Sequence, residues 1–194
     1  MANGKKKFVL NVVLFKCHDL AAADMDVVGG KSDPYVVFKL GDETKKSSCI
    51  MNNLNPQWSP PEKFQFELDE WENEFLIAQV YDYDRLSKDD LIGSAVIPLT
   101  LYAGDRHYEM YSYPLVLPDE VGGLGAPRSD LFLQISLSAT DGSPVEMATV
   151  VTTNSAWYGA AIARRFNEGD KTNPSEFVAT VARVCGESLL AMTR

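Results

Sequence analysis

The sequence contains few of the residues from which disulfide-rich and zinc-binding proteins are built. Its only cysteines are Cys17, Cys49 and Cys185, three in 194 residues. An odd and widely spaced set does not form a disulfide framework, and no two of them have the close spacing of a zinc site. We therefore expect reduced thiols that pack as small apolar side chains, as in a cytoplasmic protein.

Long apolar runs are also missing. No stretch reaches the roughly 18 apolar residues that a membrane-spanning helix needs. Lysines at residues 5–7 precede the apolar segment Phe8 to Phe15, which is the order seen in signal peptides. Asn11 interrupts that segment, however, and no small-residue cleavage site follows it. The expected location is therefore the cytoplasm.

The chain carries no excess of positive charge. It has 18 lysines and arginines against 27 aspartates and glutamates, which gives a net charge of −9. Binding to nucleic acid needs a basic surface, so no nucleic-acid partner is expected. An acidic protein that docks on anionic lipid needs a local basic patch or bound cations.

Up to about residue 140, short runs of β-branched, aromatic and alternating apolar residues predict β-strands. The expected strands cover residues 8–15, 35–40, 64–68, 75–81, 95–99, 108–116 and 131–137. Turn signals separate them at residues 28–30, 41–42, 55–56, 59–61 and 122–127. Because no helices alternate with these strands, we predict an all-β sandwich rather than a parallel α/β sheet.

The most informative segment runs from Val80 to Gly93. Asp82 and Asp84 stand two residues apart on one face of an extended chain, which places their carboxylates roughly 7 Å apart. Asp90 follows after a short loop. Carboxylates brought together repel one another, and calcium, which takes about six to eight oxygen ligands, would relieve that repulsion.

Neither an EF-hand nor a catalytic site accounts for this segment. An EF-hand loop that began at Asp82 would need Gly at its sixth position and Glu at its twelfth, where the chain has Ser87 and Gly93. A catalytic carboxylate pair would need a nucleophile or base, and the only histidines, His18 and His107, stand in unrelated segments. We therefore expect the aspartates to bind a metal rather than to catalyse a reaction.

Three motifs, taken in order, resemble the C2 domains of protein kinase C and the synaptotagmins. They are Ser-Asp-Pro-Tyr-Val at residues 32–36, Leu-Asn-Pro-Gln-Trp at 54–58, and the aspartate-rich segment 82–93 that ends in Ile-Gly. The resemblance covers residues 5–140 and implies an eight-stranded antiparallel Greek-key β-sandwich. The chain opens at the strand of residues 8–15 and closes at the strand of residues 131–137, which is similar to the type II order of phospholipase C domains.

In calcium-binding members of this family, aspartates of loop 1 (residues 20–33 here) and loop 3 (residues 82–90) hold the metal. The resemblance assigns as ligands the carboxylates of Asp33, Asp82, Asp84 and Asp90 and the backbone carbonyls of Met25 and Tyr83. A fifth aspartate is expected upstream of Asp33, but the family spacing falls on Val27. Asp26 fits if the loop carries one extra residue, and Asp24 is the alternative.

The resemblance also implies a function. Two or three calcium ions would cancel the charge of the aspartates and leave coordination positions for oxygens of lipid headgroups. The residues expected to contact the membrane are Val27, Val28 and Leu86 at the loop tips, with Arg85 and Lys88 beside the headgroups. A strong phosphoinositide site is not expected, because Lys45 and Lys46 lack a second basic pair further along the chain.

Residues 141–194 differ in character and are interpreted as an α-helical extension. Asn173, Pro174 and Glu176 form a helix start, with Asn as the N-cap and Glu three residues after it. The helix would reach about Met192 and carry a broad apolar face. That face could pack on the sandwich, pair with another copy of the chain or bind a partner protein.

The leading hypothesis is a non-enzymatic module that binds anionic phospholipid membranes when calcium is present, in membrane trafficking or signalling. Such a protein would be cytoplasmic and reversibly peripheral to membranes. The alternative is a calcium-independent scaffold for protein interactions, built from the sandwich and the tail helices. A hydrolase that used the aspartates would need a nucleophile–base pair, for which the sequence gives no signal.

Overall fold

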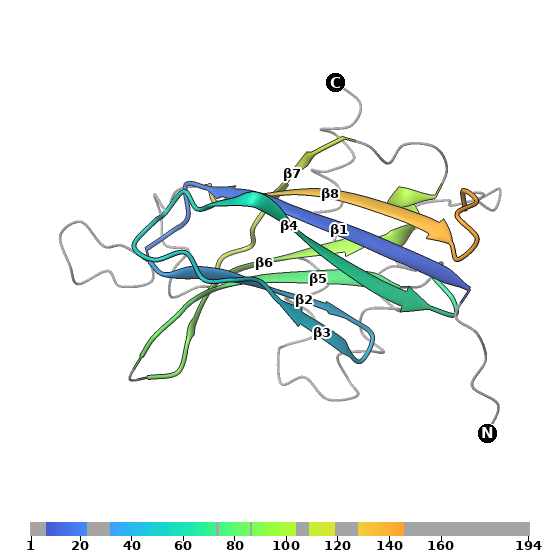
Figure 1. Ribbon diagram of the computed structural model, residues 1–194. Coiled ribbons are helices and arrows are strands. Elements are labelled where there is room, and N and C mark those ends of the chain that lie inside the picture. The colour runs from blue at the N-terminus through green and yellow to red at the C-terminus, as the bar shows by residue number, and fades with distance from the viewer. Residues whose placement is uncertain are drawn as a thin grey trace. The chain divides into compact units, whose positions relative to one another are not determined.

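Two antiparallel four-stranded sheets face each other in the computed structural model, which describes residues 7–22, 32–72, 74–85, 87–103, 109–118 and 128–145. Sheet A has the order β4 (Gln57–Leu68), β1 (Phe8–His18), β8 (Asp130–Ala139), β7 (Tyr111–Pro114). Sheet B has the order β3 (Glu43–Lys46), β2 (Pro34–Leu40), β5 (Phe75–Asp82), β6 (Asp90–Pro98). Figure 1 shows the two layers, and a 3₁₀ helix, η1 (Leu99–Tyr102), follows β6. The predicted β-sandwich is therefore confirmed.

The period-two pattern of the strands builds the core between the sheets. On β8, for example, every second residue from Leu131 to Leu137 is at most 1% exposed, and the residues between them are half-buried. Burying such a side chain stabilises the fold by about 1.5–3 kcal/mol relative to leaving it in water. On β5, the inward row of Leu76, Ala78 and Val80 is fully buried and continues into Asp82.

Most expected strands are confirmed, but the turn expected at residues 59–61 is wrong, because Pro60 and Pro61 lie inside β4. β4 is an edge strand that pairs only with β1, so it has one side on which no backbone donor is needed. The register with β1 also shifts here, between the pair Leu14–Glu62 and the pair Lys16–Gln57. A proline pair is tolerated in such an irregular stretch. The short, charged strand β3 was not predicted, because it has no apolar alternation.

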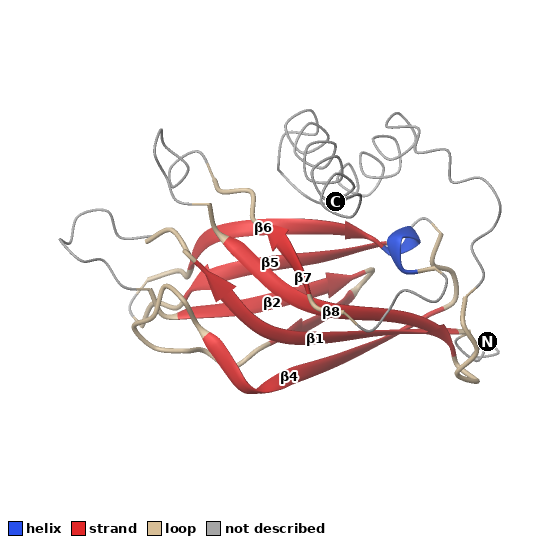
Figure 2. Cartoon of the chain, turned by 90° about the horizontal axis from the view of Figure 1, so that it is seen from above, coloured by secondary structure: helices blue, strands red, loops and turns tan. Residues whose placement is uncertain are grey.

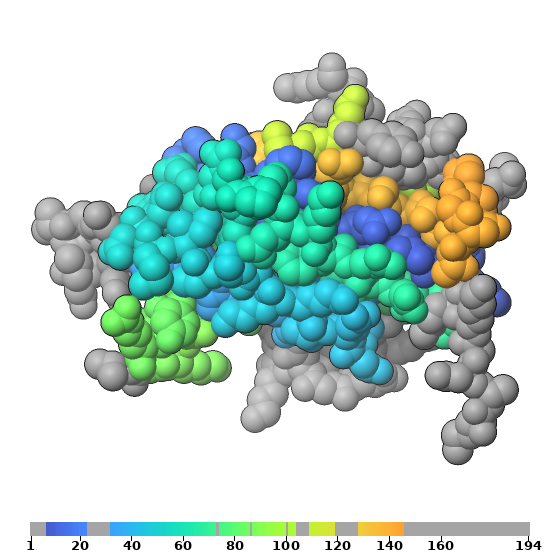
Figure 3. Space-filling view, viewed as in Figure 1, coloured from blue at the N-terminus to red at the C-terminus, as the bar shows by residue number. Residues whose placement is uncertain are grey.

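Three connections gather at one end of the sandwich because successive strands run in opposite directions. They are loop 1 between β1 and β2, loop 2 (residues 47–56) between β3 and β4, and loop 3 between β5 and β6. Figure 2 shows η1 at the end of the sandwich opposite to the one where β5 leads into loop 3. In Figure 3, loop 3 (green) protrudes at the same end as loop 2 (light blue to cyan).

Residues 141–145 continue against the sandwich rather than leaving it. Pro144 forms a β-bridge with Ser138, and Val145 is only 5% exposed within the core. The chain divides into two compact units between residues 146 and 147, and the helices expected in the extension lie outside the described residues. In the described part of the chain, no helix has the length and apolar character to span a membrane.

Gly93 stands where β6 meets the segment that follows β7. Ser94 and Val116 exchange two backbone hydrogen bonds there, of 2.9 and 2.8 Å. A Cβ atom on Gly93 would lie 3.0 Å from the Leu115 Cβ and 3.1 Å from the Val116 carbonyl oxygen. The close approach of the two backbones therefore requires glycine at this position of the Ile-Gly motif.

We expect Gly93→Val to destabilise the fold by about 1–3 kcal/mol, the usual cost of inserting atoms into a packed core. Thermal unfolding followed by circular dichroism measures this. Ser94→Val is the matched control, because the Ser94 side chain is on the other face of the same strand. Equal melting temperatures for Gly93→Val and the wild type would contradict the close packing.

Candidate metal centre

The pairing of β2 with β5 brings two of the expected ligands together. Pro34 lies opposite Asp82 in the register, so Asp33 stands beside the end of β5. The Asp33 amide donates to Asp82 Oδ1 at 2.7 Å, and the Tyr83 amide donates to the Asp33 carbonyl oxygen at 3.0 Å. Aspartates separated by 49 residues in sequence are thereby fixed next to each other.

Asp82 is a buried carboxylate, with 8% of its surface exposed. Burial raises its pKa, and the charges of Asp33 and Asp84 raise it further, while the Asp33 amide and the Ser32 hydroxyl lower it as hydrogen-bond donors. Among the described residues, no lysine, arginine or histidine forms an ion pair with any of these three carboxylates. The charge at this position is therefore costly to the protein when no cation is bound.

Loop 2 holds the Asp33 carboxylate from the other side. The Asn52 amide donates to Asp33 Oδ1 at 2.6 Å, and Cys49 Sγ donates to the Asp33 carbonyl oxygen at 3.1 Å. Asn52 has a φ of 56°, the left-handed region in which asparagine is one of the few tolerated residues. The sequence offered only a weak signal for this role, the turn-forming asparagines at residues 52 and 53.

In loop 3, Asp84 is half-buried and its carboxylate accepts a hydrogen bond from Ser87 Oγ at 2.9 Å. The Asp84 amide donates to Asp89 Oδ1 at 3.0 Å. Asp90 pairs with Asp82 in the register of β5 and β6 and is exposed. The fold therefore returns Asp90 to the end of β5, as the spacing of the sequence indicates.

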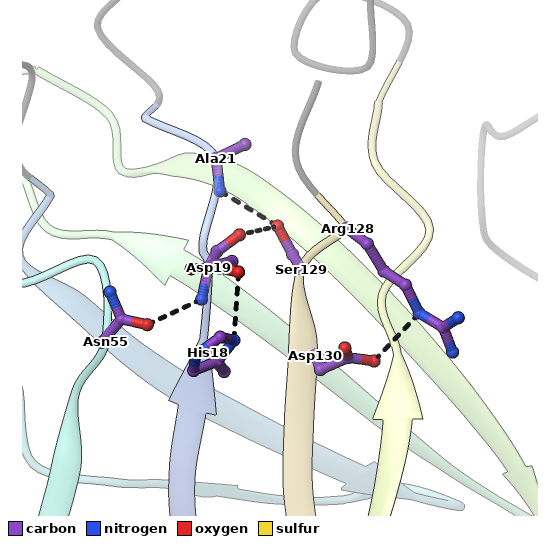
Figure 4. A network of polar contacts seen from close by, with 7 residues as sticks. All are labelled: His18, Asp19, Ala21, Asn55, Arg128, Ser129 and Asp130. Carbon is purple, nitrogen blue, oxygen red and sulfur yellow. Dashed lines mark hydrogen bonds and ion pairs between the residues drawn. The ribbon is translucent and has the colours of Figure 1, made fainter. Parts of the chain in front are cut away.

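The start of loop 1 is tied to β8 and to loop 2 (Figure 4). Ser129 Oγ accepts from the Ala21 amide and donates to the Asp19 carbonyl oxygen, both at 3.0 Å. The Asp19 amide donates to Asn55 Oδ1 at 2.9 Å. Ser129 is buried, and nothing in its sequence context signals this role.

The structure describes only some of the residues that the sequence predicts to contact the membrane. Arg85 and Lys88 are exposed on loop 3. Two exposed apolar side chains at the same end were not expected from the sequence, Met51 of loop 2 (45% exposed) and Tyr83 of loop 3 (39% exposed). The remaining candidates fall outside the described residues: Asp24, Met25, Asp26, Val27 and Val28 of loop 1, and Leu86 of loop 3.

The lysines of β3 are engaged within the protein. Lys45 Nζ lies 2.8 Å from Glu43 Oε1 and over the Phe66 ring. Lys46 Nζ lies 3.4 Å from the centroid of the Tyr35 ring. Both lysines of β3 therefore have partners within the protein.

The donor set fits a hard cation. Asp33, Asp82, Asp84 and Asp90 supply carboxylate oxygens, the ligands that calcium prefers. Within the described ranges, no three acidic, histidine or cysteine side chains gather tightly enough to hold a metal by themselves. The two candidates for the upstream aspartate belong to the undescribed part of loop 1, so the described residues contain only one side of the proposed site.

Comparison with known proteins decides the family. The model of the C2 domain family matches residues 8–113. The chain belongs to the C2 domain family.

Several relatives of this C2 domain are known. Extended synaptotagmin-3 of Xenopus tropicalis is 39% identical over 101 residues, and synaptotagmin-4 of Arabidopsis thaliana is 41% identical over 93 residues. These matches cover 50% and 46% of this chain but only 11% and 16% of the two relatives. The calcium-bound C2A and C2B domains of Extended-Synaptotagmin 2 superimpose with a TM-score of 0.57 at 29% identity, over 69% of this chain and 46% of that one.

The left-handed turn of loop 2 gives a stability prediction for the C2 domain. Asn52→Val should lower the free energy of unfolding by about 1–2 kcal/mol, because a β-branched residue strains at positive φ. Asn52→Gly, which tolerates this φ, is the matched control and should unfold like the wild type. Urea denaturation measures both. Identical curves for the valine and glycine variants would show that the turn does not constrain loop 2.

Asp82→Asn should make the calcium-free C2 domain more stable, because a neutral amide removes the buried charge and still accepts from the Asp33 amide. The effect has a defined pH dependence. Because the pKa of Asp82 is raised in the folded state, the stability of the wild type relative to Asp82→Asn should rise as the pH falls from neutral through that pKa towards the ordinary value of an aspartic acid.

Urea denaturation in chelator at several pH values tests this. The advantage of Asp82→Asn over the wild type should be largest at neutral pH and should shrink as the pH falls. A variant that is less stable than the wild type at neutral pH would mean that the Asp82 charge is balanced inside the protein.

Proposed function

We propose that this C2 domain is a calcium-dependent module for binding anionic phospholipid membranes, acting in membrane trafficking or signalling from the cytoplasm. The calcium ions, two or three in number, would lie between loops 1 and 3. Their ligands would be Asp26, Asp33, Asp82, Asp84 and Asp90, with the backbone carbonyls of Met25 and Tyr83. The protein would join membranes reversibly as a peripheral component.

The observation that carries this proposal is the buried carboxylate of Asp82. It lies at the end of a row of core side chains, beside two other aspartates, and no basic residue of the described chain pairs with it. A structural role alone would be filled better by a neutral residue. A cation that binds here would offset both the desolvation of Asp82 and the repulsion between the carboxylates.

The same charges explain why calcium would control membrane binding. In a chain of net charge −9, a cluster of carboxylates at the loop end repels anionic lipid. Two or three divalent ions would neutralise five carboxylates wholly or in large part. Exposed Arg85 and Lys88 would then face the headgroups, and the apolar candidates Val27, Val28 and Leu86 would enter the interface.

The comparisons support the proposal in two respects. Family membership gives a fold with three loops at one end, and a structure similar to this chain is a calcium-bound pair of C2 domains. The chain also carries the aspartates of loop 3 at the spacing of the calcium-binding members that it resembles.

Sedimentation with phosphatidylserine-containing vesicles tests the proposal. The wild-type chain should pellet with the vesicles in calcium and stay in the supernatant in chelator. Asp84→Asn should abolish pelleting. Asp42→Asn is the matched control, because it removes the same charge from the exposed turn between β2 and β3, at the opposite end of the sandwich.

Two outcomes would contradict the proposal. Equal pelleting in calcium and in chelator would favour the calcium-independent alternative, and so would an Asp84→Asn variant that behaves like the wild type. Pelleting with vesicles of phosphatidylcholine alone would mean that negative lipid charge is not what the loops recognise.

A further inference from the structure

Asp89 stands between the two loop 3 aspartates assigned to the metal, Asp84 and Asp90, but the structure gives it a different surrounding. Its two carboxylate oxygens accept hydrogen bonds from different elements. Oδ1 accepts from the Asp84 amide at 3.0 Å, and Oδ2 accepts from the Tyr35 hydroxyl at 2.5 Å. One carboxylate therefore joins the backbone of loop 3 to strand β2.

The partner on β2 is held firmly. Tyr35 is 5% exposed, and its ring stacks on Tyr81 of β5 with centroids 5.6 Å apart. The ammonium of Lys46 lies 3.4 Å from the centroid of the Tyr35 ring, which adds an electrostatic attraction to the ring. The Tyr35 hydroxyl is thus a fixed point of sheet B from which a loop can be positioned.

Asp89 also differs from Asp82 in its partners. Both oxygens of the Asp89 carboxylate have hydrogen-bond donors within the protein, the Tyr35 hydroxyl and the Asp84 amide. The contacts of Asp89 are thus made to the fold itself.

We propose that Asp89 is a positioning residue and not a metal ligand: it ties the backbone of Asp84 to Tyr35 and so holds the Asp84 carboxylate ready for calcium. The inference rests on the proposed function of the loop end. A loop that is already ordered before it binds loses less conformational entropy on binding, so the tie raises calcium affinity without touching the ion.

Tyr35→Phe separates this role from that of a ligand, because it removes one hydroxyl and leaves every carboxylate in place. We expect Tyr35→Phe to weaken calcium binding by about ten- to 150-fold, the range for losing one hydrogen bond to a charged group. Asp89→Asn should weaken it to a similar extent, because the amide offers one acceptor oxygen instead of two. The double variant should bind calcium as tightly as the weaker-binding of the two single variants, because both substitutions break the same hydrogen bond.

The experiment is calorimetric titration of the full chain with calcium chloride. Tyr81→Phe is the matched control, because it removes the hydroxyl of the neighbouring stacked ring, which donates to Gln79 rather than to Asp89. If Asp89 were a ligand, Asp89→Asn would weaken binding while Tyr35→Phe would leave it unchanged or strengthen it. That result would overturn the proposal.

A second measurement needs no metal. Amide hydrogen exchange followed by nuclear magnetic resonance in chelator should show faster exchange of the Asp84 amide in Tyr35→Phe than in the wild type or Tyr81→Phe. Exchange of core amides on β5 should stay the same, which separates a local tie from a general loss of stability. An unchanged Asp84 amide would overturn the proposal.

The two proposals fail in different ways. If the wild type takes up no calcium in the titration, the proposed function fails and the positioning role fails with it. If the wild type binds calcium and Asp84→Asn does not, while Tyr35→Phe binds as tightly as the wild type, only the role of Asp89 is wrong.

Discussion

The pairing of β2 with β5 is the constraint on which the loop end depends. It places Asp33 beside Asp82 at the point where the inward row of β5 leaves the apolar core. The pairing is held by buried side chains such as Val36, Phe38, Ala78 and Val80, which are all fully buried. Hydrophobic burial therefore stabilises a position at which like charges repel one another, a repulsion that a bound cation would relieve.

The described parts of the three loops are hydrogen-bonded to this frame through polar residues outside the expected ligand set. Ser129 ties the start of loop 1 to β8, the Asn52 amide ties loop 2 to Asp33, and Asp89 ties loop 3 to Tyr35. A binding site on loops needs such support, because a loop ordered only by the ligand loses affinity to the entropy of ordering. The buried core stabilises the fold, and these hydrogen bonds position the residues of the loops.

Local pattern in the sequence was enough to predict most of the strands and the all-β class. The alternation of Leu131 to Leu137 reports directly on a half-buried strand, because side chains of a strand alternate between two faces. The prolines at residues 60 and 61 gave a false turn signal. Whether a proline interrupts a strand depends on its place at an edge of the sheet, and that is decided by pairing with a distant segment.

The candidate ligands of loop 3 could be predicted because they lie close together in the sequence. Asp82, Asp84 and Asp90 lie within nine consecutive residues, so their spacing carries the signal. The supporting residues could not be found in this way, because their partners are remote in sequence. Ser129 and Ala21 are 108 residues apart, and Asp89 and Tyr35 are 54 apart, so only the folded arrangement reveals the contacts.

The central claim is that the carboxylates at the end of β5 carry a charge that no basic residue of the described chain pairs with and that a bound cation would balance. The most direct test is the free energy of unfolding of the wild type measured by urea denaturation at increasing calcium concentration, with magnesium as the comparison. We predict a midpoint that rises steadily with calcium, as expected for a ligand that binds the folded state alone, and rises much less with magnesium. A midpoint that is the same in millimolar calcium and in chelator would contradict the claim.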